Sequence, residues 1–509
     1  MRILIFHGYL LRGTGSNIYN ASLVRALVRL GHEVHLLCQD RHAAELDFVD
    51  ATASWSEGRL EVHTLREPVR CTAYLPDIGD VLPVYVADTY EGFRAVPFPE
   101  LDDEAVERYV EANVAAARAV AERTSPDAAL ANHLVMGPTV LARAIGGRVP
   151  YAVKVHGSAL EYTVKPNPER FLPYAREGLA QAAGVLVGSR HTAESLWAAM
   201  DDPGLPDRTR LGPPGVDTDT FCPRPPEQAA AELEVLAAGL GGAQAAGWGG
   251  EAGAAAALRS LDPAREEIVT YVGKLIVSKG VDLLIAAWPL VYDQVPNARL
   301  CVVGFGTYRD GLGQLAGALR DGDLDAAREI ATGGWELEGG PRGELRYLRA
   351  FLDTVGDDYL RAARGAFERL HFTGRLEHDD LPPLLVNSSA QVVPSTFPEA
   401  FGMVAAEAAA CGALPLSAAH SGLAEVSRRL QEAVDEDLRP LLSFDLGPRA
   451  VEDIADKLSS WLTLDPARRS RAAAALSAKA RGLYGWEGVA RGVIAAAEGR
   501  LDELARPAA

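Results

Sequence analysis

Short apolar runs alternate with stretches of helical periodicity along the whole chain. The first runs are RILIF, EVHLLC, LEVHT, AALA, YAVKV and GVLVG, at residues 2–6, 33–38, 60–64, 128–131, 151–155 and 184–188. Between the first two, NIYNASLVRALVRLG at 17–31 has the spacing of an amphipathic helix. Runs that are apolar on both faces and separated by helices are typical of parallel strands covered on both sides. The pattern therefore predicts an α/β fold with a doubly wound parallel sheet.

A proline-rich segment interrupts this rhythm near the middle of the chain. GPPGVDTDTFCPRPPE, at 212–227, reads as a linker. After it the rhythm restarts with IVTYV, RLCVV, LHFT, AQVVP and ALPLS, at 268–272, 299–303, 370–373, 390–394 and 413–417. A chain of 509 residues is long enough for two domains of roughly 200–250 residues. We expect two doubly wound Rossmann-like domains facing a cleft, residues 1–215 and 216–483, with ligands at the carboxyl ends of the strands.

Two stretches of the second domain do not follow the alternation. Residues 225–265 are rich in Ala and Gly and predict a helix plus a flexible loop. Residues 311–366 hold helical, charge-mixed sequence between two predicted strands. We interpret both as surface insertions. The acidic piece DGDLD at 321–325 lies inside the second one and away from any strand end, which favours a solvated loop over a metal site.

The composition excludes several classes of protein. A net charge of −19 argues against a nucleic-acid partner, which would need a basic surface. No segment has the ~18–20 uninterrupted apolar residues of a transmembrane span, and the N-terminus reads as a buried strand rather than a secretory signal. The five cysteines are scattered, with no C-x-x-C spacing, which favours a reducing cytoplasm over a disulfide framework or a zinc site.

The segment STFPEAFGMVAAEAAACGALPLSAAHSG, at 395–422, carries two glutamates in small and apolar surroundings. The alanine-rich stretch 404–411 predicts a helix, so that Glu399 lies in the loop before it and Glu407 about one turn inside. The first backbone N–H groups of that helix, at 402–404, form a natural binding site for phosphate. Two flanking carboxylates would repel phosphate but would accept hydrogen bonds from hydroxyls on either side of it, as in a nucleotide sugar. The simpler alternative is an acid near a helix N-terminus and an exposed helix residue.

A second motif, YVGKLIVSKGVDLLIAA at 271–287, follows a predicted strand. Lys274 and Lys279 come directly after the strand and before an amphipathic helix. Two cations at the carboxyl end of a strand suit a diphosphate whose charge grows as a glycosidic bond breaks. The alternative is a solvated pair of lysines.

In the first domain, the loop HGYLLRGTGSN brings Gly13 and Gly15 between a strand and a helix, where backbone can approach phosphate or an acceptor. Taken alone, it also suggests a dinucleotide site with Asp40 on a ribose, but the loop is long and no third glycine follows. His133 and His156 each follow a predicted strand, although a lone histidine is more often structural. The aromatic and acidic stretches 81–93 and 95–113 fit either an acceptor loop or a packed surface loop.

These motifs resemble those of the family 4 glycosyltransferases, retaining enzymes of the GT-B architecture. The resemblance extends from the first glycine loop to Trp486, leaving out the two insertions, and its most specific part is P-E-A-F-G-x-x-x-x-E. It implies that Glu399 holds hydroxyls of the donor sugar and Glu407 those of the ribose. The family usually has Gly-Arg where this chain has Gly-Lys274, which keeps the charge but loses a bidentate fork.

The resemblance also extends to three other segments. FTGRLEHDDLPPLL, at 372–385, is similar to the segment whose backbone meets the nucleobase, and GPPGVDTDTFCP is similar to the family's hinge. The C-terminal sequence from 484 resembles a helix that crosses back onto the first domain, expected over 484–505. The predicted site comprises catalytic residues (Glu399, Lys279, Lys274, His156), donor-binding residues (Gly15, Gly374, Arg375, Leu376, Phe401, Gly402, Met403, Val404, Glu407) and acceptor-binding residues (Gly13, His133, Tyr162).

The resemblance implies a metal-independent, retaining transfer of a hexose-type sugar to an acceptor hydroxyl by front-face attack. The donor is expected to be a nucleotide-sugar co-substrate of the UDP or GDP type, without a further cofactor. Phosphorylases and nucleotide-sugar epimerases use the same fold and are alternatives. A non-catalytic sugar-nucleotide-binding protein is an alternative from another class.

Overall fold

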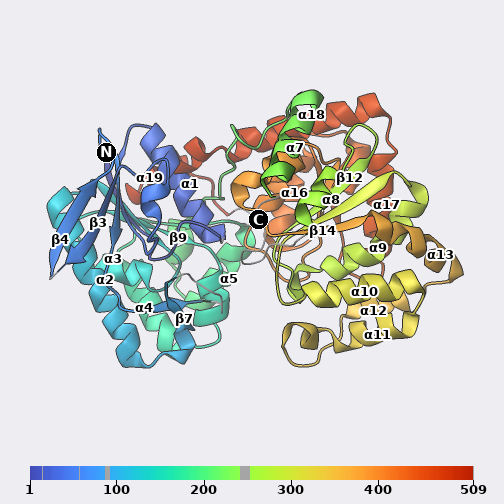
Figure 1. Ribbon diagram of the computed structural model, residues 1–509. Coiled ribbons are helices and arrows are strands. Elements are labelled where there is room, and N and C mark those ends of the chain that lie inside the picture. Colours follow the sequence, from blue (N-terminus) through green and yellow to red (C-terminus); the bar gives the residue numbers. More distant parts are fainter. Residues whose placement is uncertain (14, 57, 86–91, 241–252, 508–509) are drawn as a thin grey trace. The chain divides into compact units, whose positions relative to one another are not determined.

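The computed structural model describes residues 1–13, 15–56, 58–85, 92–240 and 253–507 (Figure 1). The chain divides into two compact units, Met1–Gly215 with Tyr484–Ala509, and Val216–Leu483. The first unit therefore ends inside the proline-rich segment. Each unit is built on a sheet of mainly parallel strands flanked by helices, which confirms the predicted α/β class.

The sheet of the first unit has nine strands. In spatial order they are β11 (Thr209–Leu211), β10 (Gly184–Val187), β9 (Tyr151–Val155), β8 (Ala128–Asn132), β1 (Arg2–Phe6), β2 (Glu33–Leu37), β5 (Cys71–Leu75), β3 (Ala51–Ser56) and β4 (Arg59–Thr64). All neighbours are parallel except β3 and β4. A separate parallel pair joins β6 (Val81–Val84) to β7 (Arg94–Pro97).

Two hydrophobic clusters lie on the two faces of this sheet. Ile3 and Ile5 of β1 belong to the cluster with the helices at residues 15–29 and 486–497, whereas Leu4 and Phe6 belong to the cluster with the four helices between residues 103 and 200. This alternation is what a strand buried on both faces produces. The helices of the unit are α1 (Gly15–Arg29), α2 (Asp103–Thr124), α3 (Gly137–Ile145), α4 (Pro168–Ala180), α5 (Arg190–Met200), α6 (Leu205–Arg208) and α19 (Trp486–Ala497).

The edge of the first sheet differs from the prediction. The run LEVHT was expected to form a covered parallel strand, but β4 pairs antiparallel with β3 alone and is mostly exposed. Its alternation of apolar and polar residues is that of a strand with one solvated face. The buried strand β5 and the partly buried strand β3 were not predicted, because CTAYL and ATASWS contain small and polar residues in place of long aliphatic ones.

The second unit has a six-stranded, fully parallel sheet. Its order is β14 (Leu370–Gly374), β13 (Ala298–Val303), β12 (Glu267–Val272), β15 (Ala390–Val393), β16 (Leu414–Ala418) and β17 (Ser443–Phe444). Its helices are α7 (Pro226–Gly239), α8 (Ala254–Arg259), α9 (Val281–Gln294), α10 (Arg309–Asp321), α11 (Leu324–Gly333), α12 (Arg346–Leu352), α13 (Asp357–Ala366), α14 (Pro382–Leu385), α15 (Met403–Cys411), α16 (Ser421–Gln431), α17 (Ala450–Leu462) and α18 (Pro466–Tyr484).

The stretch 311–366 is more than a surface insertion. It forms most of α10 together with α11, α12 and α13 (yellow to orange in Figure 1), and α10 and α13 contact α9. Three leucines of α10 are fully buried, and Trp288 of α9 donates a hydrogen bond to the Ala366 carbonyl. The DGDLD piece caps a helix, since the Asp323 side chain accepts from the Ala326 amide at the start of α11. Of the other stretch, 225–265, α7 and α8 are described, whereas residues 241–252 lie outside the described residues, so the loop expected in this stretch stays a prediction.

The C-terminal helix is shorter than expected. Gly485 separates α18 from α19, and α19 ends at Ala497 rather than continuing to 505. Within the first unit, α19 lies beside α1, as Figure 1 shows. A Cβ atom on Gly215 would lie 2.4 Å from the Trp486 indole, so only glycine fits there. Among the described residues, no helix is long and apolar enough to cross a membrane.

Candidate functional site

A short 3-10 turn brings Lys279 to the carboxyl edge of the second sheet. The turn, Val277–Lys279, lies between β12 and α9. Gly280 follows with φ +65°, and a Cβ atom there would lie 2.1 Å from the Pro394 carbonyl oxygen. The turn therefore lies directly against the end of β15, and glycine is required for this approach.

Glu399 lies in the loop after β15 and is fixed at three points. Its carboxylate accepts hydrogen bonds from the Lys279 ammonium and, at 2.8 Å, from the Ser395 hydroxyl. Its amide donates to the Ser421 hydroxyl at 2.9 Å, and its carbonyl accepts from the Gly422 amide. The predicted site residues Glu399 and Lys279, which are 120 positions apart, are thus in direct contact.

The environment of Glu399 keeps its carboxyl group ionised. Burial alone would raise the pKa of Glu399, but the Lys279 ammonium and the Ser395 hydroxyl outweigh this effect and leave the pKa lowered. About a quarter of the side chain is exposed. An ionised, oriented carboxylate with an exposed portion can accept hydrogen bonds from hydroxyls of a ligand.

Two helices begin beside the Glu399 loop. α15 starts at Met403 and α16 at Ser421. A Cβ atom on Gly422 would lie 2.6 Å from the Phe401 Cα, so the start of α16 contacts the segment that leads into α15. The first amides of a helix have no intrahelical partner and attract anions. The amides of Gly402, Met403 and Val404, which were predicted to bind a diphosphate, lie at the start of α15.

Glu407 is buried in α15, so the alternative of an exposed helix residue is wrong. Its side chain is 3% exposed, and its Oε1 lies 2.8 Å from the Nε2 of His378. Burial would lower the pKa of His378, but the Glu407 carboxylate raises it to about 10. At neutral pH the imidazolium therefore forms an ion pair with Glu407, and its ring contacts Phe221 at 5.0 Å between centroids. Sequence reasoning missed His378, a single histidine in a loop.

The ends of β13 and β14 lie beside the loop that carries Lys274. The Gly374 carbonyl accepts from the Gly304 amide at 2.8 Å, and the Leu275 amide donates to the Phe305 carbonyl. A Cβ atom on Gly304 would lie 1.8 Å from the Gly273 carbonyl oxygen. The pair Gly304 and Gly306 was not singled out from the sequence, although G-x-G directly after the buried run RLCVV was the available signal.

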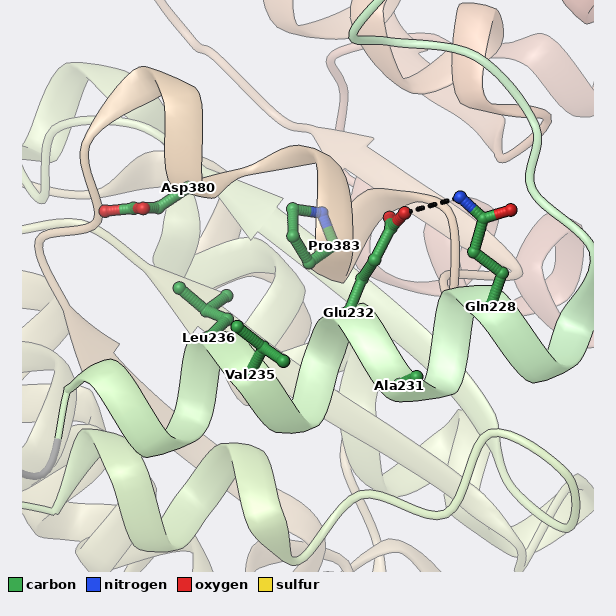
Figure 2. A pocket seen from close by; sticks show the side chains of 7 residues that line it. All are labelled: Gln228, Ala231, Glu232, Val235, Leu236, Asp380 and Pro383. Carbon is green, nitrogen blue, oxygen red and sulfur yellow. Dashed lines mark hydrogen bonds between the residues drawn. The ribbon is translucent and has the colours of Figure 1, made fainter.

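Two other predicted donor residues, Arg375 and Leu376, directly follow Gly374 at this edge. Arg375 forms an ion pair with Glu377 at 2.7 Å, and Leu376 is 9% exposed. A separate pocket of about 360 Å³ lies between α7 and the segment after β14 (Figure 2). Gln228, Ala231, Glu232, Val235, Leu236, Asp380 and Pro383 line it. It contains none of the predicted site residues.

In the first unit, His156 belongs to a buried polar network at the carboxyl ends of β1, β8 and β9. Its Nε2 donates to the Asn132 side chain at 2.9 Å, which in turn donates to Asn20 at 2.8 Å. Asn20 donates to the Nδ1 of His7 at 3.0 Å. Burial lowers the pKa of His7 to about 4 and the pKa values of His133 and His156 well below the usual value. All three rings are therefore neutral at pH 7.

His133 is an unusual member of this group. Its backbone has φ +68°, its side chain is buried, and neither ring nitrogen has a hydrogen-bond partner among the described residues. Its ring lies 4.9 Å from that of His156 and 4.6 Å from that of Tyr85. Tyr162, in contrast, is 46% exposed in the turn Ala159–Val164.

Two glycines of the first unit, Gly13 and Gly15, have uncrowded backbone. Among the described residues nothing lies within 4 Å of a Cβ atom built on either of them, which leaves room for a ligand beside the backbone. Asp40 accepts hydrogen bonds from the amides of Leu11 and His42, each at 2.9 Å. Its carboxylate is thus used to hold the loop, which disfavours the dinucleotide interpretation. Among the described residues, no group of His, Cys, Asp and Glu could hold a metal ion.

Known proteins resemble this chain over nearly its whole length. Residues 13–220 match Glycosyltransferase Family 4, and residues 358–477 match Glycosyl transferases group 1. The D-inositol 3-phosphate glycosyltransferase of Frankia alni is 25% identical over 492 residues, covering 94% of this chain and 93% of that protein. Sucrose-phosphate synthase from Thermosynechococcus elongatus has a similar fold, with a TM-score of 0.57 and 19% identity over 99% of this chain and 98% of that one.

A third relative is Anabaena Alr3699/HepE, solved in complex with UDP and glucose. Its TM-score is 0.55, with 16% identity over 99% of this chain and 100% of that one. At these identities the likeness of the solved structures extends to the fold. The chain belongs to the family 4 glycosyltransferases of the GT-B type.

Proposed function

We propose that this enzyme transfers a hexose-type sugar from a nucleoside diphosphate sugar to an acceptor hydroxyl, with retention of the anomeric configuration. The observation that carries the proposal is the contact between Lys279 and Glu399 beside the N-termini of α15 and α16. It combines an oriented carboxylate for sugar hydroxyls with positive charge and helix amides for a diphosphate.

In the proposed reaction, the acceptor hydroxyl attacks from the face on which the diphosphate leaves. Lys279 and the amides at 402–404 stabilise the charge that grows on the leaving phosphate. The departing phosphate oxygen takes the acceptor proton. The protein therefore supplies positioning and electrostatic stabilisation, and the proposed transfer needs no metal ion.

The relatives guide the choice of substrates. The Anabaena structure contains UDP, which makes UDP-sugars the first donors to test, with GDP-sugars as the alternative. The Frankia relative is named for an inositol phosphate and the Thermosynechococcus relative for a sucrose phosphate. We propose a sugar or polyol hydroxyl as acceptor. All five cysteines are unpaired, which supports the proposed cytoplasmic location.

The test is a thermal-shift screen with UDP-, GDP-, ADP- and dTDP-sugars. A ligand at about 100 times its dissociation constant adds roughly 2.7 kcal/mol to native stability. We expect one nucleotide series to raise the melting temperature of the wild type, and Glu399→Gln to weaken the preference for the sugar-bearing form over the free nucleotide. No shift with any nucleotide sugar at millimolar concentration would refute the proposal.

Retention is tested separately, by the anomeric coupling constant of the product in NMR spectra. The α-linked product from an α-linked donor is expected. Product formation that depends on inorganic phosphate would identify a phosphorylase instead, and isomerised donor without acceptor would identify an epimerase.

A further inference from the structure

Glu338 connects the segment 311–366 to the turn that carries Lys279. It ends the short 3-10 turn Trp335–Glu338, between α11 and α12. Its Oε2 accepts a hydrogen bond from the Val277 amide at 2.7 Å, across 61 positions of sequence. Val277 is the first residue of the turn that ends at Lys279.

The residue before the Lys279 turn does not supply an acceptor for the first amide of that turn. This residue is Ile276, whose side chain makes no capping hydrogen bond. The first amides of any helical turn need an external acceptor, and Ser, Thr, Asp or Asn at the preceding position normally supplies it. Here a carboxylate from a distant segment takes that role, and a hydrogen bond to an ionised acceptor is stronger than one to a neutral group.

The turn that presents Glu338 is itself fixed. The Leu345 amide donates to the Ala331 carbonyl at 2.7 Å, which closes the loop at its base. Gly334 has φ +49°, and a Cβ atom there would lie 1.9 Å from the Gly343 carbonyl oxygen. A Cβ atom on Gly311 of α10 would lie 3.3 Å from the Leu337 Cβ, so the turn also lies against α10.

We propose that Glu338 is a positioning residue for sugar transfer, acting through Lys279. By capping the turn Val277–Lys279, it holds the Lys279 ammonium where that group meets both Glu399 and the leaving diphosphate. This inference rests on the function proposed for Lys279. It gives the segment 311–366 a role in catalysis through a single hydrogen bond, in addition to its packing against α9.

Three variants test the role of Glu338 in turnover of UDP-glucose, or of the donor that the screen identifies. Glu338→Ala removes the cap and is expected to lower kcat roughly tenfold with KM changed less than about twofold, because Lys279 acts on charge that develops in the transition state. Glu338→Gln keeps an acceptor and should retain most of the activity. Glu336→Ala is the matched control, since Glu336 lies on the same turn, forms an ion pair with Arg342 at 3.6 Å and has half of its side chain exposed.

Two measurements separate positioning from a general loss of structure. Hydrogen exchange of the peptide around Val277 should quicken in Glu338→Ala and not in Glu336→Ala. In a Lys279→Ala background, Glu338→Ala should lower kcat by less than about twofold further, because the residue through which it acts is gone. Three outcomes would each overturn the inference and leave the proposed function standing. They are a further tenfold loss of kcat in the Lys279→Ala background, unchanged hydrogen exchange at Val277 in Glu338→Ala, and wild-type kcat in Glu338→Ala. A wild type that turns over no nucleotide sugar would overturn the proposed function as well.

Discussion

Two glutamates eight positions apart in one segment have different partners and different surroundings. Glu399 contacts a lysine and a serine and stays partly exposed, whereas Glu407 is buried against a charged histidine. The first arrangement leaves a carboxylate accessible to a ligand. The second holds a carboxylate in place inside α15, since the imidazolium of His378 offsets the cost of burying it. The same residue type thus provides an accessible acceptor and a fixed internal charge.

The charge of Lys279 should be needed for the chemical step. Lys279→Ala is expected to lower kcat/KM by on the order of 10²-fold, about 3 kcal/mol, because the ammonium meets charge that develops on the leaving phosphate. Steady-state rates with the identified donor measure this loss. Lys479→Ala, which removes a lysine paired with Glu432 on the surface, serves as the control and should keep wild-type rates. Normal turnover in Lys279→Ala would exclude the role.

The ion pair of His378 with Glu407 should make stability depend on pH in the alkaline range. The carboxylate raises the pKa of His378 from 6.5 to about 10, so the contribution of the pair is complete below pH 6.5 and disappears as the pH rises through 10. The difference in unfolding free energy between wild type and His378→Gln should therefore shrink over that range. Urea titrations at about pH 6, 8 and 10 measure it, and a constant difference would contradict the assignment.

At the level of elements, the strands and helices that were predicted correctly are those whose own residues determine them. RILIF and IVTYV became the buried strands β1 and β12, and the alanine-rich stretch after Gly402 became α15. The strands β3 and β5 were not predicted, because their place in the sheet follows from their neighbours rather than from their own residues. The contact of Lys279 with Glu399 and the cap from Glu338 join segments 120 and 61 positions apart. No local pattern encodes such contacts, since tertiary packing creates them.

Gly280 shows how strongly one position can constrain an element. It has φ +65°, which costs a residue with a side chain about 1–2 kcal/mol, and its Cβ would collide with the Pro394 carbonyl. Gly280→Ala should therefore lower the unfolding free energy by roughly 3 kcal/mol and displace the Lys279 turn. Gly322→Ala is the control, because φ there is +77° but a Cβ atom would have no described residue within 4 Å. Equal losses in urea titrations of the two variants would show that the contact with Pro394 has no effect.

At the scale of the whole molecule, charge is distributed unequally between the two candidate sites. The second unit presents an ionised pair, Lys279 and Glu399, at the edge of its sheet. The first unit holds His7, His133 and His156 as neutral rings at the corresponding edge of its own sheet. A neutral, hydrogen-bonding cluster suits hydroxyl groups better than phosphates, which fits the acceptor-binding role predicted for His133.

The buried neutral histidines should also limit stability in acid. The pKa of His7 is lowered to about 4, so between pH 6.5 and 4 the unfolded chain binds a proton that the folded chain does not. Stability then falls as the pH falls, by about 1.4 kcal/mol per pH unit for this group and roughly 3 kcal/mol in all. His7→Asn should reduce the fall in unfolding free energy between pH 6.5 and 4 by roughly 3 kcal/mol. This holds whatever the effect of the substitution on stability at neutral pH. His63→Asn changes an exposed position of β4 and should leave the fall in unfolding free energy between pH 6.5 and 4 as it is in the wild type. An equal fall in the wild type and in both variants would show that His7 is not buried as a neutral ring.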